Sequence, residues 1–161
     1  MEYVPKGNLE QAIQKKIISN AKFTTKYIFR CLAHLVIAVM AMHNKNILHR
    51  DIKTQNIFID LSGVHKLGDF GISRELKQDA KALTACGTPY FMPPEVCLGK
   101  PYDSKADVWA IGVIIYELLM LKKPFRGEQI YNVLQSITKC SYDPLSEDCD
   151  PNLQMLIVSL L

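Results

Sequence analysis

The sequence has no signature of a disulfide framework or of a structural metal site. Its five cysteines are an odd number, and no two of them form a CxxC pair. Disulfide scaffolds and zinc sites depend on paired or closely spaced cysteines. We therefore expect free, mostly buried thiols and a reducing compartment. This pattern favours a cytoplasmic location, taken broadly as intracellular and without separating the cytosol from the cytoskeleton or the nucleus.

Neither a large charge excess nor a long apolar segment is present. The chain has 19 basic and 16 acidic residues, a net charge of +3, which is too small to indicate nucleic acid or a membrane surface. The first five residues lack the basic and apolar regions of a signal peptide. The longest apolar stretch, near residues 108–121, is shorter than the roughly 20 residues of a membrane span, and Glu117 interrupts it. We predict no nucleic-acid partner and no membrane span.

The 161 residues, 48% of them hydrophobic, suffice for one domain with a sizeable core. Apolar residues at steps of three and four predict helices, and two β-rich segments around Gly63 predict a hairpin. Glycines and prolines predict a loop over residues 68–100. A short helix is expected from Asn8, and further helices are expected over residues 24–43, 104–120, 129–138 and 151–161. The expected strands are 57–60 and 64–67. The fold class is therefore mainly α with a small β element.

The helix expected over residues 104–120 is apolar nearly all round, which is typical of a central core helix. Asp107 follows Ser104 by three residues and resembles a capping box. The lysine pairs 15–16 and 122–123 are interpreted as solvated faces. Histidine is a common metal ligand, but His34, His43 and His65 are interpreted as packing or surface residues rather than ligands.

The most informative segment is residues 49–56, which read His-Arg-Asp-Ile-Lys-Thr-Gln-Asn. It follows an expected helix and precedes an expected strand, so Asp51, Lys53 and Asn56 share one short loop. A carboxylate can accept a hydroxyl proton, an ammonium can neutralise a phosphoryl oxygen, and an amide oxygen is a hard ligand for Mg²⁺. This loop therefore predicts chemistry on a phosphate ester.

Three further segments follow in order. Residues 68–71 read Gly-Asp-Phe-Gly directly after the expected hairpin, and Asp69 offers a second hard oxygen ligand. Residues 87–95 contain Gly-Thr-Pro and end in Pro-Pro-Glu, and residues 103–109 read Asp-Ser-Lys-Ala-Asp-Val-Trp. Any one of these is a weak signal, but four in this order are specific.

Together the four segments resemble the signature of eukaryotic serine/threonine protein kinases over essentially the whole chain, residues 1–161. The resemblance implies ATP- and Mg²⁺-dependent transfer of phosphate to serine or threonine hydroxyls of protein substrates. It implies that Asp51 is the catalytic base, that Lys53 contacts the transferring phosphate, and that Asn56 and Asp69 are the Mg²⁺ ligands. It also implies a partial kinase domain: the hinge and a C-terminal lobe that is truncated before its end, with the rest of the N-terminal lobe missing.

The resemblance assigns regulatory and supporting roles as well. Arg50 is similar to the arginine that pairs with a phosphorylated activation loop, and Thr84 is the expected phosphosite, modified by an upstream kinase or by autophosphorylation. Thr88 resembles the threonine that hydrogen-bonds the catalytic aspartate and lysine. Asp107 resembles the helix residue that holds the catalytic loop backbone, and His49 resembles a packed residue of the core.

The opening residues Met-Glu-Tyr-Val resemble the hinge between kinase lobes. On that match the backbone at Glu2 and Val4 bonds the adenine of ATP, and Phe58 packs under the base. Residues 66–72, 87–90, 100–109 and 116–125 are similar to NIMA-related kinases, which narrows the resemblance to that branch.

The sequence contains no glycine-rich phosphate loop, so we expect the 161 residues by themselves to be an incomplete, inactive catalytic domain. Two alternatives stay open. One is a protein-binding module without catalysis, against which the intact Asp51, Asn56 and Asp69 count. The other is a fragment that does not fold stably alone, which predicts a non-cooperative melt and binding of a hydrophobic dye.

Overall fold

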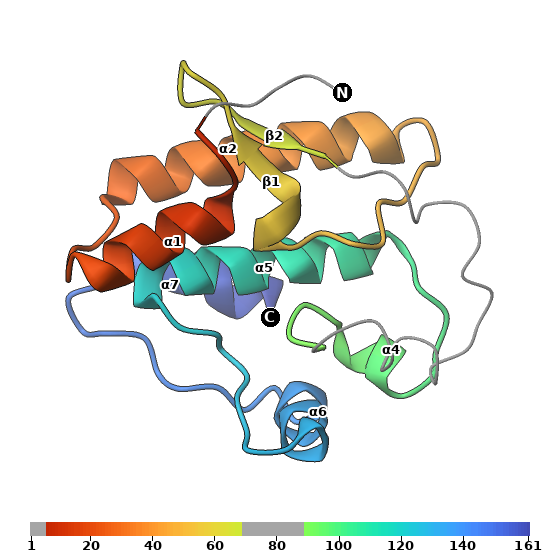
Figure 1. Ribbon diagram of the computed structural model, residues 1–161. Helices are drawn as coiled ribbons and strands as arrows, with labels where there is room; N and C mark the ends of the chain where they lie inside the picture. The colour runs from red at the N-terminus through yellow and green to blue at the C-terminus, as the bar shows by residue number, and fades with distance from the viewer. Residues whose placement is uncertain (1–5, 69–88) are drawn as a thin grey trace.

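Helix α5 (Ser104–Met120) runs through the middle of the structure, a computed structural model that describes residues 6–68 and 89–161 (Figure 1). Twelve of its residues, from Ala106 to Leu118, are buried on all sides of the helix, including the fully enclosed Tyr116. A helix that is apolar all round has to lie in the interior. The prediction of a central core helix is therefore confirmed.

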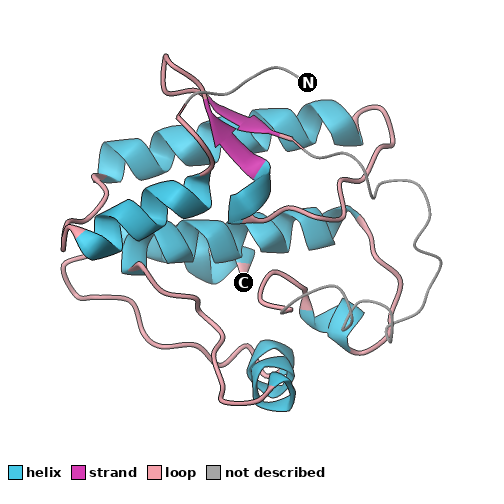
Figure 2. Cartoon of the chain, in the orientation of Figure 1, coloured by secondary structure: helices cyan, strands magenta, loops and turns pink. Residues whose placement is uncertain are grey.

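The described residues around α5 form mostly helices and one two-stranded sheet (Figure 2). This confirms a mainly α chain with a small β element, while its assignment to one lobe of a larger domain stays a prediction. The other elements are α1 (Leu9–Ile18), α2 (Thr25–His43), the 3-10 turn η1 (Thr54–Asn56), β1 (Ile57–Ile59), β2 (His65–Leu67), α4 (Pro94–Cys97), α6 (Ile130–Thr138) and α7 (Pro151–Leu160).

The capping box expected at the start of α5 is wrong. The N-cap is Asp103, whose extended backbone lets its carboxylate accept the backbone N–H of Lys105 at 2.7 Å. Ser104 is the first helical residue, and Asp107 is fully buried and turned toward the loop at residues 49–56. The Asp107 side chain is thus used for a tertiary contact and not for a cap.

Helix α2 packs one apolar stripe against α5 and β2. Its N-cap Thr24 accepts the backbone N–H of Tyr27, and the buried residues are Ile28, Cys31, Leu35 and Val39. By length and composition α2 is long and apolar enough to cross a membrane, although only 22% of that window is buried inside the structure. The expectation of no membrane span rests on the stretch near residues 108–121 and does not take α2 into account. Core helices of soluble proteins pass the same test, so a single helix of this kind is weak evidence for a membrane span.

The short sheet is held to α1 by the start of the chain segment that the structure describes. Asn8 caps α1 in a capping box with Gln11, and it also forms an isolated β-bridge with Phe58 of β1. Strands β1 and β2 are antiparallel with Phe58 opposite Lys66, and their turn uses Gly63 at φ +80°. The short helix predicted from Asn8 and the predicted hairpin around Gly63 are confirmed.

Helix α4 lies inside the segment that was predicted to be loop. Pro94 occupies its first turn, where a missing N–H costs nothing, so the prolines read as breakers are compatible with a helix start. Helix α4 packs against α6 in the lower part of Figure 1. A second apolar cluster joins α5 to this region, with Trp109 stacked on Phe125 at 5.5 Å between ring centroids.

Candidate active site

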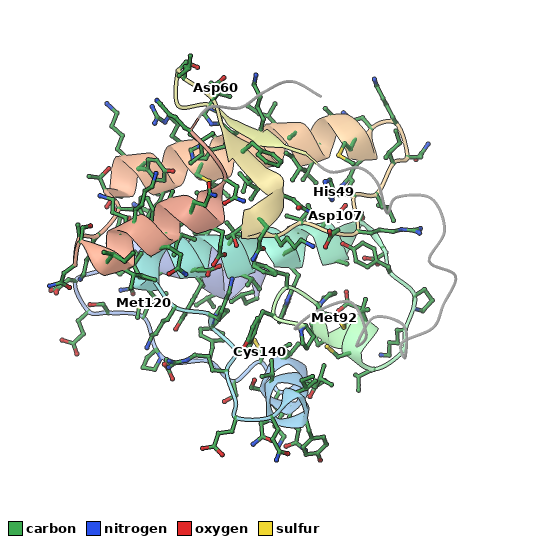
Figure 3. All side chains as sticks on the ribbon, viewed as in Figure 1. His49, Asp60, Met92, Asp107, Met120 and Cys140 are labelled. Atoms are coloured by element: carbon green, nitrogen blue, oxygen red, sulfur yellow. The ribbon has the colours of Figure 1, made fainter. Side chains whose placement is uncertain are left out.

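The loop at residues 49–56 follows α2 and precedes β1 in the sequence, and hydrogen bonds from its backbone to Asp107 of α5 hold it in place. Asp107 accepts the backbone N–H of His49 through Oδ2 and that of Arg50 through Oδ1, both at 3.1 Å. Arg50 has φ +67°, a left-handed conformation that is unfavourable for a residue with a Cβ. Figure 3 shows His49 and Asp107 next to each other at this point. The two hydrogen bonds hold the loop in a turn that its sequence alone would not favour.

The Asp107 carboxylate has two more partners. Tyr102 Oη donates to Oδ1 at 2.6 Å, and His43 Nε2 lies 2.8 Å from Oδ2. Burial, and then the adjacent carboxylate, raise the pKa of Tyr102, so this phenol keeps its proton and acts as a donor. A fully buried carboxylate is stable only when it is well hydrogen-bonded, and these four contacts meet that requirement.

His49 ties the loop to the end of the hairpin. Its side chain is buried, its Nδ1 accepts the backbone N–H of Asp51 at 3.3 Å, and its Nε2 lies 3.2 Å from the carbonyl oxygen of Gly68. Because Nδ1 accepts, Nε2 carries the proton and donates to Gly68. The expected packing role of His49 thus includes a specific link to the residue before the Asp69 segment.

The structure brings Asp51, Lys53 and Asn56 together. Lys53 Nζ lies 2.8 Å from Asp51 Oδ2, and Asn56 Nδ2 donates to the same oxygen and to the Asp51 carbonyl, each at 2.9 Å. The Asp51 side chain is 23% exposed, so it remains open to a reactant. A carboxylate beside a cation, at the surface of a rigid loop, can accept a proton from a hydroxyl next to a neutralised phosphoryl oxygen.

The orientation of Asn56 fits a metal-ligand role. Its amide nitrogen makes both hydrogen bonds to Asp51, so its Oδ1 is the atom that remains for a hard cation. Phe58 is half-buried on β1, and a Cβ at Gly68 would lie 2.8 Å from its ring. The absence of a side chain at Gly68 thus leaves room for the Phe58 ring. Both features are compatible with a nucleotide and Mg²⁺ at this edge.

Five residues named in the sequence interpretation lie outside the described residues, so their placement stays a prediction: Glu2, Val4, Asp69, Thr84 and Thr88. Arg50 is described and exposed. Its pairing with a phosphorylated threonine stays a prediction as well.

Sequence reasoning missed a charged cluster beside the loop. Lys123 was interpreted as solvated, yet its side chain is only 19% exposed and its ammonium lies 2.6 Å from Oε2 of the buried Glu117. That interpretation is wrong for Lys123. Glu10 of α1 accepts from the hydroxyl of Thr54 and, at 3.4 Å, from Gln55 Nε2. Two adjacent lysines in the sequence do not indicate that one of them pairs with a buried glutamate.

His34 of α2 and His65 of β2 form a part-buried hydrogen-bonded row with Tyr27. His34 Nδ1 accepts the backbone N–H of His65 at 3.1 Å, so the 3.1 Å contact between the two Nδ1 atoms has His65 as donor. His65 Nε2 then accepts from Tyr27 Oη at 3.0 Å. Burial, together with His34, lowers the pKa of His65 to about 4. This confirms a packing role for His65 and assigns it the neutral form.

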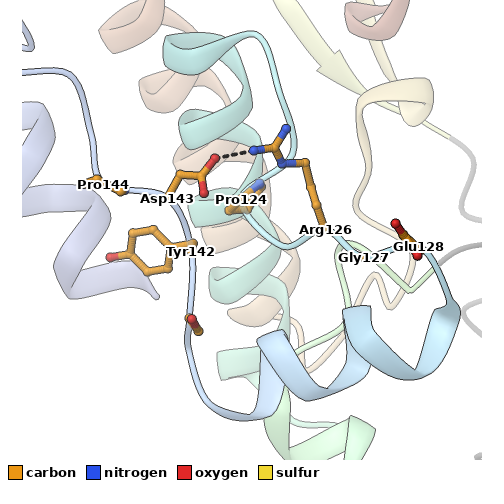
Figure 4. Close-up of a pocket in the computed structure, with 8 residues that line it drawn as sticks. Pro124, Arg126, Gly127, Glu128, Tyr142, Asp143 and Pro144 are labelled. Atoms are coloured by element: carbon orange, nitrogen blue, oxygen red, sulfur yellow. Dashed lines mark hydrogen bonds and ion pairs between the residues drawn. The ribbon is translucent and has the colours of Figure 1, made fainter.

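An open hollow of about 570 Å³ lies elsewhere, between the chain after α5 and the chain before α7 (Figure 4). Pro124, Arg126, Tyr142 and Asp143 are among its lining residues, and Arg126 pairs with Asp143. None of the loop residues 49–56, all of which are described, lines it. The candidate active site is therefore the loop that carries Asp51, Lys53 and Asn56, and not this hollow.

The chain is similar to known proteins over its whole length. Residues 1–161 match the family described as the protein kinase domain. The chain is 41% identical over 162 residues to the serine/threonine-protein kinase Nek8 of Danio rerio, covering 100% of this chain and 23% of Nek8. It is 38% identical over 167 residues to nekl-2 of Caenorhabditis elegans, covering 100% and 47%, respectively. Human Nek5 is 38% identical over 162 residues, covering 99% and 23%. The chain thus spans less than half the length of these three relatives.

Proposed function

Because the chain belongs to the protein kinase family, and within it to the NIMA-related serine/threonine kinases, we propose that it carries the catalytic loop of an enzyme that transfers phosphate from ATP to protein serine or threonine hydroxyls. The observation that carries this proposal is the convergence of Lys53 and Asn56 on the single carboxylate of Asp51. A carboxylate with only a capping or surface role would not need both an ammonium and an amide group at the same oxygen.

Asp51 is the proposed base. Its carboxylate orients the substrate hydroxyl and accepts its proton as the oxygen attacks the γ-phosphorus of ATP and the bond from that phosphorus to ADP breaks. Lys53 supplies a positive charge within 2.8 Å of Asp51, where it can also reach an oxygen of the transferring phosphate. Phosphoryl transfer depends mainly on positioning and charge stabilisation, and the backbone hydrogen bonds to Asp107 supply the positioning of this loop.

Mg²⁺ would be held by the side-chain oxygens of Asn56 and Asp69. When bound, it neutralises the negative charge of the phosphates and orients them. We further propose that the backbone at Glu2 and Val4 bonds adenine and that Phe58 packs under the base. The half-buried ring of Phe58, which lies against Gly68, supports its part of this assignment.

Regulation is proposed to act through Arg50. Phosphorylation of Thr84, by an upstream kinase or by autophosphorylation, would create an anion that Arg50 can pair with bidentately. Thr88 would hydrogen-bond Asp51 and Lys53. Partners are proposed to be protein substrates, with no nucleic acid and no membrane, and the proposed location is cytoplasmic.

The test is a phosphoryl-transfer assay with Asp51→Asn in the protein as cells make it, since we expect the 161 residues alone to be inactive. The matched control is Asp148→Asn, an exposed carboxylate away from the loop. Loss of a general base reduces the rate by about 10²–10⁴-fold, so the Asp51 variant should lose that much and the control nothing. An unchanged rate in the Asp51 variant would refute the assignment. If the wild-type protein transfers no phosphate, a binding role without catalysis becomes the better account.

A further inference from the structure

Lys123 lies in a cage formed by two carboxylates and two aromatic rings. Its ammonium is 2.6 Å from Glu117 Oε2 and 3.8 Å from Glu10 Oε2. The same nitrogen lies 4.3 Å from the ring centroid of Phe91 and 6.0 Å from that of Tyr90. Carboxylates together with aromatic faces are the surroundings in which proteins bind a basic side chain. Here the basic side chain comes from the chain itself.

The cage shares a wall with the proposed catalytic loop. Glu10 accepts hydrogen bonds from Thr54 and Gln55, which lie between Lys53 and Asn56 in the sequence. Another wall is Phe91, which belongs to the third motif, residues 87–95, and precedes α4. A protein substrate that presents a hydroxyl to Asp51 would therefore place its neighbouring residues close to this cage.

The charges of the cage require a cation. Glu117 is 3% exposed, and burial raises its pKa while Lys123 lowers it. A buried carboxylate without a cationic partner is strongly unfavourable. Lys123 is that partner for Glu117, and without Lys123 a cation from another molecule could take its place. The Glu10 side chain is 24% exposed and that of Lys123 is 19% exposed, so a side chain from solvent can reach the cage once Lys123 is shortened.

We propose that Lys123 is a specificity-determining residue: as an internal counter-ion it occupies the cage and prevents recognition of a basic substrate residue beside the catalytic loop. Without it, the Glu10, Glu117 and Phe91 walls accept an arginine or lysine of the substrate. This inference rests on the proposed kinase function for its biological meaning, although the cage itself does not depend on catalysis.

The test compares peptide pairs that differ only by arginine or glutamine at one position near the phosphorylated serine, scanned over the neighbouring positions. Wild type should show little difference within a pair. Lys123→Ala should favour the arginine peptide in kcat/KM at one position by about tenfold, the size expected for a close charge pair. Because the ratio is taken within one variant, a general loss of activity cancels. An unchanged ratio at every position overturns the proposal.

The double variant Glu117→Gln with Lys123→Ala keeps the space but removes the buried charge, and it should lose the arginine preference. If Lys123→Ala does not fold by circular dichroism, Lys123→Thr, which also shortens the side chain but keeps part of its aliphatic contact, replaces it with the same expected ratio. A preference that persists in the double variant would show that the cage is not its source.

A second readout separates this inference from the kinase assignment. If wild type phosphorylates no peptide, the proposed function fails, and the same peptide pairs, labelled with a fluorophore, are used to measure binding by fluorescence anisotropy. Tighter binding of the arginine peptide to Lys123→Ala than to wild type, by about tenfold, supports the cage. Equal affinity for both proteins overturns it.

Discussion

The carboxylate of Asp107 accepts the backbone N–H of His49 at 3.1 Å, although 58 positions separate the two residues in the sequence. This contact joins the most buried helix of the fold to the loop that carries Asp51. The loop conformation therefore depends on the core helix, and a change at Asp107 acts on the proposed active site without touching a reactant.

Asp107→Asn should destabilise the protein by about 3 kcal/mol. An amide has one acceptor oxygen, so at least one of the four donors would face the amide nitrogen instead of an acceptor. Urea unfolding followed by circular dichroism measures the change. Asp103→Asn on the same helix is the control, because asparagine is as good an N-cap as aspartate, and it should change little. Equal effects of the two substitutions would contradict the role assigned to Asp107.

Gly68→Ala should cost about 1–3 kcal/mol, because the added Cβ would lie 2.8 Å from Phe58 Cε2 and 2.9 Å from Cδ2. The additional substitution Phe58→Leu, which removes part of the ring, should recover some of that loss. Equilibrium unfolding of the four proteins of this cycle measures the coupling. Gly99→Ala is the control, since its φ of +75° causes strain without any close contact. Its cost should not depend on Phe58.

The free energy of unfolding should fall as the pH decreases from about 6.5 to about 4. The pKa of His65 is lowered from 6.5 to about 4 by burial, so in this window the unfolded chain binds a proton that the folded chain does not. The contribution of His65 is fully present above pH 6.5 and amounts to at most about 3 kcal/mol. Urea unfolding at pH 7.5, 5.5 and 4.5 measures it. His65→Gln should flatten this part of the curve, and parallel curves would contradict the assignment.

Local patterns were enough for most of the fold. The apolar positions of α2 and α5 and the β-rich segments around Gly63 predict elements whose observed bounds differ by only a few residues, because each element is determined by periodicity and by its own caps. Helix α4 was missed because a four-residue helix has no period, and its prolines also occur in loops.

The candidate site shows the opposite limit. Asp51, Lys53 and Asn56 lie within six residues, so the sequence alone places them together. The environment of Lys123 depends on Glu117, six residues earlier, and on Glu10 and Phe91, which come from distant segments. Only tertiary packing brings these residues together, and no spacing rule predicts it.

The neighbouring residues Lys122 and Lys123 should respond very differently to truncation. Lys123→Ala leaves the buried Glu117 carboxylate without its cation, which should cost about 3–5 kcal/mol. Lys122 pairs with Asp143 at 2.7 Å, but their side chains are 34% and 45% exposed. Exposed pairs contribute little and are screened by salt, so Lys122→Ala should have a small effect that disappears in concentrated sodium chloride. Urea unfolding of both variants at low and high salt measures this difference. A Lys122 effect as large as that of Lys123, or a Lys123 effect removed by salt, would show that burial does not separate the two lysines.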